Sequence, residues 1–446
     1  MNKLSRIFRP FHIPPKKKIK IFKEKDTLSK GYKLLSNYGI IGQSSTGMYH
    51  VLPMGQRSID KLIKLISSQM KLIGAQKMSQ PLLTKQSLWE ESETFEKSKD
   101  ELYIITDRAE NRFILSPTHE QALTNLLSRE LMSYRDFPQL LYQITPKFRN
   151  EHRPKLGLLR SKEFLMKDLY SFDINEEEAA KSYNKVSQAY ENFFQLIGID
   201  YCRIECLQEQ NVNRSHEYYY ISDVGDDKLY SCDHCNSKFH EDYVRSKNKC
   251  PSCLSFLNED HFVNAIEIGH TFSFGTYFSD HLGSCYVNID CKRSPLHMCS
   301  FGIGISRLIS ASVEILSTDE ELRWPLAIAP YSVCIIPPKA GSREEIEVEL
   351  LLPKIYELLE GIPNLNDDIL IDDRTEKTIG KRFLEAKLFG FPFIIIVGKD
   401  ATQETPLYEL HDLNNEKKYL MPMSLLTQYL VEQMHFDDSN INIVLS

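Results

Sequence analysis

The stretch FRNEHRPKLGLLRSKEF, residues 148–164, decides the fold of this chain. Arg149 and Glu151 stand two positions apart, which on a strand places both side chains on one face. A basic loop follows, and a second strand then carries Arg160 and Phe164, four positions apart and again on one face. The pattern predicts an antiparallel pair of strands that presents arginine, glutamate and an aromatic ring together.

These residue types suit a nucleotide with an attached carboxylate. Arginine pairs in a bidentate way with phosphate or carboxylate, glutamate accepts a hydrogen bond from an amino group, and the ring stacks on a base. A surface hairpin held together by salt bridges explains the same pattern without a ligand. Residues 148–164 alone therefore do not distinguish a nucleotide site from a surface hairpin, and the other segments of the chain are needed.

A second informative segment is MCSFGIGISRL, residues 298–308. Gly302 and Gly304 allow a close approach of the backbone, and Arg307 falls in the first turn of the helix that follows. A lone G-x-G is a weak signal, and neither a third glycine nor a later acid completes a dinucleotide-binding fingerprint. A tight strand-to-helix turn is the plain alternative.

Residues 46–81 predict a short extended piece, a turn and a long helix. The apolar residues of that helix recur at helical spacing and form one stripe: Ile59, Leu62, Ile63, Ile66 and Met70. Such a stripe is typical of packing within one chain, and a subunit interface is the sharper alternative.

The rest of the chain shows two different patterns. Residues 101–116 predict two strands joined by a polar turn, residues 117–133 begin a helix, and residues 175–198 form an amphipathic helix. Beyond WPLAIAPY at 324–331, strands and helices alternate. That alternation predicts a small α/β domain with a mainly parallel sheet.

Four of the ten cysteines fall in two C-x-x-C pairs separated by 14 residues, namely Cys232, Cys235, Cys250 and Cys253. The spacing is close to a four-thiolate zinc ribbon, in which four sulfur ligands leave no open position for catalysis. Two alternatives stay open: four reduced cysteines in a minor insertion, or a ribbon that keeps its shape without metal.

The charge of the chain is unevenly distributed. Residues 1–23 hold eight Lys or Arg and no acid, whereas the whole chain has a formal net charge of −7. A basic, acid-free N-terminus without a long apolar core is typical of an organellar transit segment, and a solvated tail that contacts RNA is the alternative. The acidic remainder argues against indiscriminate nucleic-acid binding. No apolar run approaches the roughly 18 residues of a membrane-spanning helix.

In their order along the chain, these segments resemble the motifs of class II aminoacyl-tRNA synthetases. Residues 47–81 resemble motif 1, residues 148–164 motif 2 and residues 298–309 motif 3. Within the class, the chain is similar to prolyl-tRNA synthetases of the bacterial and mitochondrial kind. The segments that carry this narrower resemblance are SPTHE at 116–120, FRNEHRPKLGLLRSKEFLMKD at 148–168, SHEYY at 215–219, EIGHTF at 267–272 and LIDDR at 370–374.

The resemblance implies an α+β catalytic domain over residues 29–327, an antiparallel sheet flanked by helices, with a Cys-rich, ribbon-like insertion at about 230–256. A smaller α/β anticodon-binding domain is implied for residues 328–446. Residues 1–28 precede both domains as the expected basic targeting segment. The implied activity joins L-proline to ATP as prolyl-adenylate and transfers it to tRNA(Pro). Mg²⁺ accompanies ATP, and structural Zn²⁺ is the additional metal that the cysteines suggest. The implied protein is a homodimer of the mitochondrial matrix with no membrane association.

The same resemblance assigns roles at matching positions. Thr118 and Glu120 would hold the secondary ammonium of proline, and His270 would line the proline pocket. Arg149 would bridge the proline carboxylate and the α-phosphate of ATP, where it would stabilise the added charge during the attack on phosphorus.

The resemblance assigns the binding of ATP to the remaining motif residues. Glu151 would contact the adenine amino group and Phe164 would stack on adenine. Arg307 would lie against the other ring face and reach the γ-phosphate, and Glu267 would sit near Mg²⁺ and the phosphates. For tRNA, the implied contacts are Arg153 at the acceptor end and Arg374 and Arg382 at the anticodon.

Two departures from the family pattern stand out. Ser300 replaces the first glycine of motif 3 in the class. Ser306 stands where glutamate commonly precedes the arginine in the class, and in this respect the chain resembles the prolyl branch. Only about 130 residues separate motifs 2 and 3. A large editing domain is therefore not expected, nor is hydrolytic clearance of alanyl-tRNA.

Three other functions are weighed against this one. A non-catalytic synthetase-like protein would be expected to lose the arginines of motifs 2 and 3, which are present here as Arg149 and Arg307. A synthetase for threonine, serine or histidine is disfavoured by the context of Glu120 and His270. A zinc-ribbon module that binds nucleic acid would explain only a small part of the chain.

Overall fold

The computed structural model describes residues 1–10, 29–206, 212–240, 249–250, 252–256 and 262–434. The chain divides into two compact units, each described here by itself. The core unit comprises Ser44–Tyr49 and Ile63–Ala311, and the terminal unit comprises Met1–Gln43, His50–Leu62 and Ser312–Ser446. The domain bounds expected from the sequence stay predictions, and residues 11–28 of the expected targeting segment lie outside the described residues.

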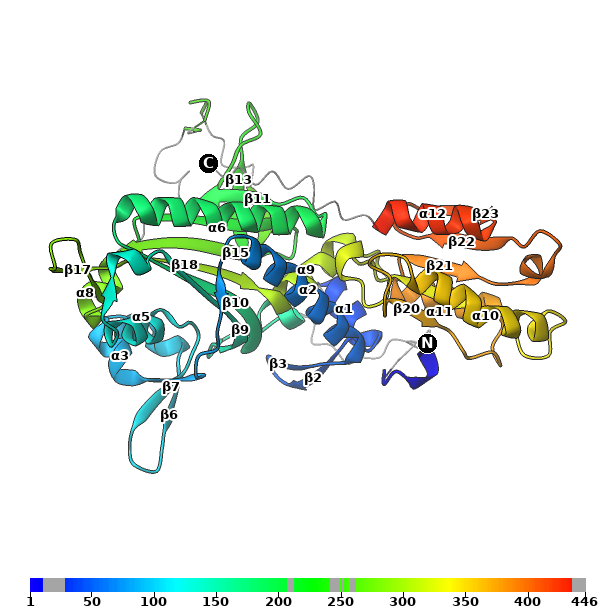
Figure 1. The fold of residues 1–446 in the computed structure, drawn as a ribbon, viewed down its shortest axis with the longest axis horizontal. Coiled ribbons are helices and arrows are strands. Elements are labelled where there is room, and N and C mark those ends of the chain that lie inside the picture. Colours follow the sequence, from blue (N-terminus) through cyan, green and yellow to red (C-terminus); the bar gives the residue numbers. More distant parts are fainter. Residues whose placement is uncertain (11–28, 207–211, 241–248, 251, 257–261, 435–446) are drawn as a thin grey trace. The chain divides into compact units, whose positions relative to one another are not determined.

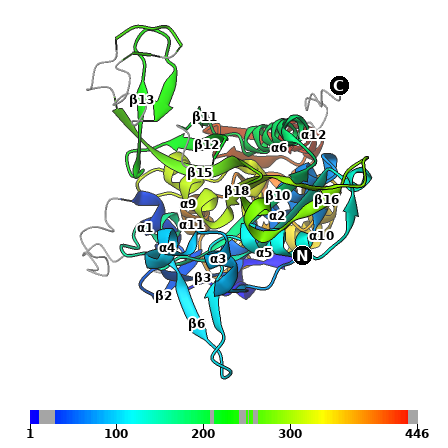
Figure 2. The same cartoon turned by 90° about the vertical axis from the view of Figure 1, so that its left-hand side faces the viewer.

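The core unit is built on a large, mainly antiparallel sheet (Figures 1 and 2). Its strands follow the order β11 (Cys202–Glu205), β12 (Arg214–Ile221), β15 (Phe262–Gly275), β18 (His297–Gly304), β10 (Glu163–Asp173), β9 (Gln139–Phe148) and β4 (Gln76–Lys77). Two short strands, β13 (Asp227–Ser231) and β14 (Lys238–His240), extend from β15 as a ribbon. Sequence-based expectation and structure agree on an antiparallel sheet for this part of the chain.

Helix α6 (Glu176–Ile197) covers one face of this sheet, against β10, β15 and β18 (Figure 1). Its first turn is stabilised by the side chain of Asn175, which accepts a hydrogen bond from the Glu178 N–H, and by three acidic residues near the positive end of the helix dipole. It ends at Gly198, whose φ of +78° is a conformation that glycine adopts without strain. The buried stripe of α6, which includes Tyr183, Tyr190 and Phe194, fixes the position of the strands that carry the site.

Shorter elements surround the sheet. The helices of the core unit include α3 (Gln86–Glu91), α4 (Phe95–Ser98), α5 (Glu120–Ser128) and α8 (Tyr277–Leu282). The smaller sheets contain β5 (Leu83–Lys85), β7 (Arg112–Leu115), β6 (Tyr103–Thr106), β17 (Arg293–Pro295), β16 (Cys285–Val287) and β8 (Met132–Ser133). The predicted strand pair at 101–116 and the helix after 117 are confirmed.

The long helix predicted within residues 46–81 is α2 (Pro53–Leu72), preceded by β2 (Ile41–Ser45) and β3 (Met48–Val51). Four members of its apolar stripe are buried within the single chain: Ile59, Leu62, Ile66 and Met70. The structure therefore favours packing within the chain for these four side chains. A further helix, α9 (Ile305–Leu316), follows β18 directly.

The terminal unit alternates strands and helices, as its sequence predicts. Its sheet has the order β1 (Asn2–Lys3), β20 (Ile369–Ile371), β19 (Val333–Ile336), β21 (Phe393–Ile396), β22 (Tyr408–Asp412) and β23 (Lys417–Met421). The first four strands run parallel. Helix α10 (Glu345–Glu360) connects β19 to β20, and α11 (Ile379–Phe389) connects β20 to β21, before α12 (Met423–Met434) ends the described chain. The buried apolar strands β19 and β20 are typical of a sheet covered on both faces.

The first ten residues belong to this sheet, which the basic composition did not reveal. Asn2 and Lys3 pair with β20, Leu4 is 2% exposed, and both the N–H and the hydroxyl of Ser5 donate to the Asp373 carboxylate, at 2.9 and 2.6 Å. Without β1, strand β20 would present an unpaired edge. The first ten residues are therefore a structural part of the terminal unit.

Candidate active site and metal centre

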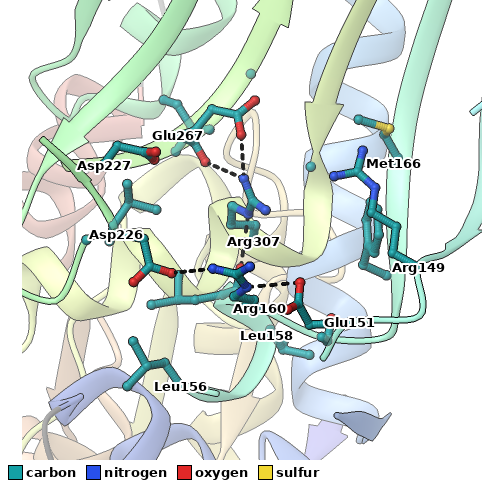
Figure 3. A pocket seen from close by; sticks show the side chains of 18 of the residues that line it. Arg149, Glu151, Leu156, Leu158, Arg160, Met166, Asp226, Asp227, Glu267 and Arg307 are labelled. Carbon is teal, nitrogen blue, oxygen red and sulfur yellow. Dashed lines mark hydrogen bonds and ion pairs between the residues drawn. The ribbon is translucent and has the colours of Figure 1, made fainter. Parts of the chain in front are cut away.

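A pocket in the core unit collects most of the residues predicted to bind substrate (Figure 3). The candidates that line it are Arg149, Glu151, Phe164, Glu267, His270 and Arg307. Thr118 and Glu120 are placed beside this group, at the N-terminus of α5. One region of the sheet thus brings together side chains from residues 118 to 307.

The prediction that Arg149 and Glu151 share a strand face is wrong. Both follow the last residue of β9, in a loop that continues to the first residue of β10, and Arg160 lies in the same loop. The β9–β10 pairing ends at Phe148 and Glu163, and within the loop Leu156 takes a left-handed conformation with a φ of +57°. The side chains converge through the geometry of the loop rather than through strand alternation.

Arg149 is positioned over the ring of Phe164, with its Cζ atom 5.2 Å from the ring centroid. Burial lowers the pKa of Arg149, and the positive charge of Arg307 lowers it further, although Glu267 acts in the opposite direction. Arg149 forms no ion pair with any residue that the structure describes. Its guanidinium therefore lies near a second cation, and the carboxylates that influence its pKa do not form an ion pair with it.

Glu151 lies at the rim of the pocket, where Arg160 connects it to Asp226 (Figure 3). Nε of Arg160 donates to Oε2 of Glu151 at 2.9 Å, and Nη1 donates to Oδ2 of Asp226 at 3.1 Å. We call these three residues the rim cluster. Burial raises the pKa of Glu151, but hydrogen bonds from Arg160 and from the Arg153 N–H outweigh it, so the pKa is lowered. The side chain of Arg153 points into solvent from the same loop.

Arg307, Glu267 and His270 form a second ionic group. Nη1 of Arg307 donates to Oε2 of Glu267 at 2.8 Å, and Nδ1 of His270 lies 3.0 Å from Oε1 of the same carboxylate. Burial raises the pKa of Glu267, but the contact with His270 and the charge of Arg307 lower it by more. Glu267 is therefore ionised at neutral pH and lies in the wall of the pocket.

Gly302 makes room for this group. A Cβ atom at Gly302 would lie 2.5 Å from Nε2 of His270 and 2.8 Å from the terminal methyl of Met166. Any side chain there would displace the imidazole, so the glycine of the 298–308 segment serves close packing rather than phosphate binding.

A buried carboxylate, Glu120, lies near Arg149. The hydroxyl of Thr118 donates to its Oε2, and the hydroxyl of Ser300 donates to its Oε1 at 2.8 Å. Tyr170 supports Thr118, because the two hydroxyl oxygens are 3.2 Å apart. We call Glu120, Thr118, Ser300 and Tyr170 the floor cluster.

Beneath the floor cluster is a layer of buried charges. The hydroxyl of Tyr170 donates to Oδ2 of Asp168 at 2.8 Å, and Nζ of Lys147 donates to the same oxygen at 2.9 Å. Lys147 also lies 2.8 Å from Nδ1 of His119, whose Nε2 is 3.0 Å from the carbonyl oxygen of Pro81. Burial lowers the pKa of His119 to about 4, with Lys147 the next cause, so this imidazole is neutral at physiological pH.

The arrangement leaves two opposite charges, Glu120 and Arg149, without an ion-pair partner among the described residues. Like Arg149, Glu120 forms no ion pair with any described residue, and its resident hydrogen-bond donors are neutral hydroxyls. A buried carboxylate is costly without a cation, and a half-buried guanidinium next to a second arginine favours an anion. The pair therefore matches a small zwitterion, with further anionic groups directed toward Arg307.

The four cysteines come together as predicted. Their sulfur atoms all lie within 4.8 Å of one another, and the closest pairs, Cys232 with Cys253 and Cys235 with Cys250, are 3.6 Å apart. Four thiolates bound tetrahedrally to zinc at about 2.3 Å would be about 3.8 Å apart. Residues 241–248 and 251 of the expected insertion lie outside the described residues.

The two C-x-x-C pairs share one turn geometry. In the first, the Asn236 N–H donates to the Cys232 carbonyl at 2.8 Å, and in the second the Leu254 N–H donates to the Cys250 carbonyl at 2.8 Å. Asn236 and Leu254 both have a left-handed backbone, with φ of +56° and +61°. Two matched turns that direct four sulfur atoms to one point fit a metal ion better than four unrelated thiols.

The two arginines of the terminal unit that were predicted to contact tRNA, Arg374 and Arg382, differ in burial and in contacts. Arg382 is fully buried, and it donates to the carbonyl oxygens of Asp372 and Pro337 at 3.0 and 2.6 Å. The expectation that Arg382 contacts tRNA directly is therefore corrected, because its donors hold the domain together. Arg374 is partly exposed and forms ion pairs with Asp372 and Glu385.

The structure also identifies site residues that sequence reasoning missed. Ser300 had been noted only as a departure from the class pattern, yet it donates directly to Glu120. Asp226 and Tyr170 were not singled out at all. The family resemblance could have drawn attention to Ser300, whereas Asp226 lies 66 residues from Arg160 and only the fold joins them.

Comparison with protein families agrees with this architecture. Residues 103–316 match the tRNA synthetase class II core domain (G, H, P, S and T), and residues 332–433 match an anticodon binding domain. The solved structure of Giardia lamblia prolyl-tRNA synthetase in complex with prolyl-adenylate aligns with a TM-score of 0.75 at 17% identity, over 89% of this chain and 73% of that one.

Curated relatives match along almost the whole chain. The probable mitochondrial proline–tRNA ligase of Homo sapiens is 37% identical over 91% of this chain and 86% of its own length. The probable mitochondrial enzyme of Schizosaccharomyces pombe is 33% identical over 90% and 92%, and the proline–tRNA ligase of Agrobacterium fabrum is 32% identical over 89% and 92%. The relatives thus include both mitochondrial and bacterial proteins.

Proposed function

Because the chain belongs to the class II aminoacyl-tRNA synthetases that act as proline–tRNA ligases, we propose that its pocket in the core unit is where proline and ATP become prolyl-adenylate. The observation that carries this proposal is the pair of opposite charges left open by Glu120 and Arg149. An amino acid supplies an ammonium for the first and a carboxylate for the second.

The floor cluster is proposed to select the amino group. The Thr118 and Ser300 hydroxyls orient the Glu120 carboxylate toward the secondary ammonium of proline, which compensates its buried charge. His270, held by Glu267 and packed against Phe272 at a ring distance of 4.8 Å, lines the side of the proline ring.

Arg149 is proposed to carry the electrostatic part of the first step. A carboxylate oxygen of proline attacks the α-phosphorus of ATP, an O–P bond forms, and the bond to the β-phosphate breaks with release of pyrophosphate. Arg149 contacts both reacting groups and stabilises the charge that builds on the phosphoryl oxygens. No covalent nucleophile on the protein is required, because positioning and charge stabilisation carry this chemistry.

The nucleotide occupies the other part of the pocket. Glu151 accepts a hydrogen bond from the adenine amino group, Phe164 stacks on the base, and Arg307 reaches the γ-phosphate. The carboxylates of Glu267 and Asp227, which both line the pocket, are oxygen donors of the kind Mg²⁺ prefers. When bound, Mg²⁺ neutralises charge on the phosphates.

ATP–pyrophosphate exchange with the full chain tests the proposal. We expect exchange with proline and not with threonine, serine or histidine, and a loss of about 100-fold or more in Arg149→Ala. Arg108→Ala, in the exposed β6–β7 turn, is the matched control and should behave like the wild type. Unimpaired exchange by Arg149→Ala would remove Arg149 from the mechanism. No exchange by the folded wild type would favour a non-catalytic protein.

Two regions are proposed to contact tRNA(Pro). Arg153, which is exposed in the loop at the rim, is proposed to contact the acceptor end, and Arg374, which is partly exposed, is proposed to contact the anticodon. Arg153→Ala should weaken aminoacylation of tRNA while leaving pyrophosphate exchange intact. Equal loss in both assays would show that Arg153 acts on adenylate formation instead.

We further propose a homodimer, as motif 1 of the class implies, and a location in the mitochondrial matrix. The mitochondrial relatives and the acid-free basic N-terminus support the location. Because residues 2–5 pack on the terminal unit, we expect the imported protein to retain them. Mass spectrometry of the protein isolated from mitochondria and light scattering of the purified protein test the two statements.

The Cys cluster is proposed to bind one structural Zn²⁺. Four thiolates fill the coordination sphere, so the ion would stabilise the ribbon that carries β13 and β14 rather than act on substrate. Metal analysis of the reduced protein should find about one zinc per chain, lost in Cys250→Ser and kept in Cys291→Ser, an exposed cysteine outside the cluster. Absence of zinc from the wild type would remove the proposal.

A further inference from the structure

Asp226 is a pocket residue to which the proposed reaction gives no task. It lies in the turn between β12 and β13, at the base of the Cys-rich ribbon, and it lines the pocket with Val224, Gly225 and Asp227. The turn and the loop that carries Glu151 come from distant parts of the sequence. Asp226 is where the two meet (Figure 3).

The backbone fixes the position of Asp226 closely. A Cβ atom on the preceding residue, Gly225, would lie 2.1 Å from the carbonyl oxygen of Ala265, so no side chain can be accommodated there. On the other side, Asp227 pairs with Ala265 on β15, the strand that also carries Glu267. The turn is thus anchored to a central strand of the sheet, and Asp226 cannot drift from the pocket.

Asp226 holds two cations of the loop. Its Oδ2 accepts a hydrogen bond from Nη1 of Arg160 at 3.1 Å, and its Oδ1 accepts one from Nζ of Lys155 at 2.5 Å. Burial raises the pKa of Asp226, but these two hydrogen bonds lower it by more, so the carboxylate is charged at neutral pH. An exposed ion pair contributes little by itself, whereas a network that fixes an arginine between two carboxylates also fixes its geometry.

Arg160 divides its hydrogen bonds between Asp226 and Glu151. Only Nε contacts Glu151, at Oε2, while Nη1 is occupied by Asp226. If Asp226 lost its charge, Arg160 would be free to turn its guanidinium fully onto Glu151 in a bidentate pair. Such a pair would occupy the carboxylate that is proposed to receive the adenine amino group.

We propose that Asp226 is a positioning residue for ATP: it restrains Arg160 so that Oε1 of Glu151, which accepts from the Arg153 N–H, keeps its second lone pair available for the adenine amino group. The inference rests on the proposed role of Glu151. If the inference holds, Asp226 at the base of the Cys-rich ribbon affects the binding of ATP and does not affect the binding of proline.

The test compares Asp226→Asn with Asp223→Asn in ATP–pyrophosphate exchange. Asn is almost the same size as Asp, and Asp223 is an exposed acid of the same turn whose side chain has no hydrogen bond or ion pair to a described residue. We expect Asp226→Asn to raise the KM for ATP by about three- to tenfold, with the KM for proline unchanged. Asp226→Glu should restore part of the loss, and Asp223→Asn should match the wild type.

A second measurement reports directly on the contact between Glu151 and the adenine amino group. Purine riboside triphosphate lacks the amino group, so the ratio of kcat/KM for ATP to that for this analogue reports the Glu151 contact. Asp226→Asn should reduce the ratio by about the same three- to tenfold, and Glu151→Ala, which removes the acceptor, should reduce it as well.

The outcomes separate the inference from the function on which it rests. If the wild type exchanges with proline and Asp226→Asn keeps the wild-type ratio and KM for ATP, the inference is wrong. A rise in the KM for proline as large as that for ATP would also overturn it, because it would indicate a general structural defect. If Glu151→Ala keeps the full ratio, the adenine contact and the inference both fail, although the ligase activity stands.

Discussion

The floor and rim clusters hold one glutamate each, by different means. Glu120 in the floor is buried and receives hydrogen bonds from two hydroxyls, whereas Glu151 at the rim has a side chain that is 18% exposed and pairs with a guanidinium. Hydroxyl donors fix a carboxylate without neutralising it, so Glu120 retains its full need for a cation. The ion pair between Glu151 and the exposed Arg160 is partly open to solvent, which weakens it, so at Glu151 a ligand can replace part of it at small cost.

The difference indicates how one pocket serves two ligands. The amino acid must be selected by a charge that only a bound ammonium satisfies, which requires a rigid and dry site. The nucleotide is larger and is held by many contacts, so its contact with Glu151 can be shared with a protein side chain. We therefore expect substitutions in the floor to affect proline strongly and substitutions at the rim to affect ATP moderately.

Glu120→Gln in the floor cluster should have the largest effect. The amide keeps the shape and removes the charge, so kcat/KM for proline should fall by about 100- to 1,000-fold. Steady-state exchange at saturating ATP measures this, with the exposed Glu96→Gln on α4 as the control. Retained proline activation would mean that the ammonium is bound elsewhere.

Phe164→Ala addresses the nucleotide side. The substitution removes both the stacking surface for adenine and the ring under Arg149, so we expect the KM for ATP to rise by about 10- to 100-fold. Phe256→Ala, a ring that is 79% exposed, should have no effect. Unchanged ATP dependence in Phe164→Ala would contradict the stacking role.

Ser300→Ala tests the floor without removing its charge. One of the two hydroxyl donors to Glu120 is lost, and the KM for proline should rise by about tenfold while the KM for ATP stays the same. Ser306 is the control within the same segment, because its hydroxyl accepts from the Leu165 N–H rather than contacting Glu120. Equal effects of the two alanine variants on proline would show that Ser300 has no special role.

His119→Gln should have the smallest effect on activity, and should instead change how stability depends on pH. The folded pKa of about 4 lies below the ordinary 6.5, so between these pH values the unfolded chain binds a proton that the folded chain does not. The free energy of unfolding therefore rises with pH across this window, by up to about 3 kcal/mol. Gln can accept from Lys147 and donate to Pro81, so this variant should show a flatter pH dependence of the unfolding midpoint. An unchanged slope would exclude His119 as the titrating group.

The sequence predicted the chemistry of the site better than its local geometry. Arg149, Glu151, Phe164 and Arg307 were identified because motif order along the chain carries the family pattern, which does not depend on the exact backbone. The strand assignment for Arg149 and Glu151 failed because strand alternation stops where β9 ends and the loop through Pro154 begins. Arg382 was misjudged since a charged residue on a helix predicts exposure, while here its donors satisfy buried carbonyl oxygens.

By itself, the sequence determined the class of protein, the alternation of strands and helices in the terminal unit, and the identity of most charged groups in the pocket. These properties depend on residue types and on short-range periodicity, which a linear sequence records directly. Only the tertiary structure decided that Ser300 orients Glu120, that Asp226 restrains Arg160, and that the first residues complete a sheet. Each is a contact between residues 66 to 368 positions apart, and such contacts form only when the strands between them have paired.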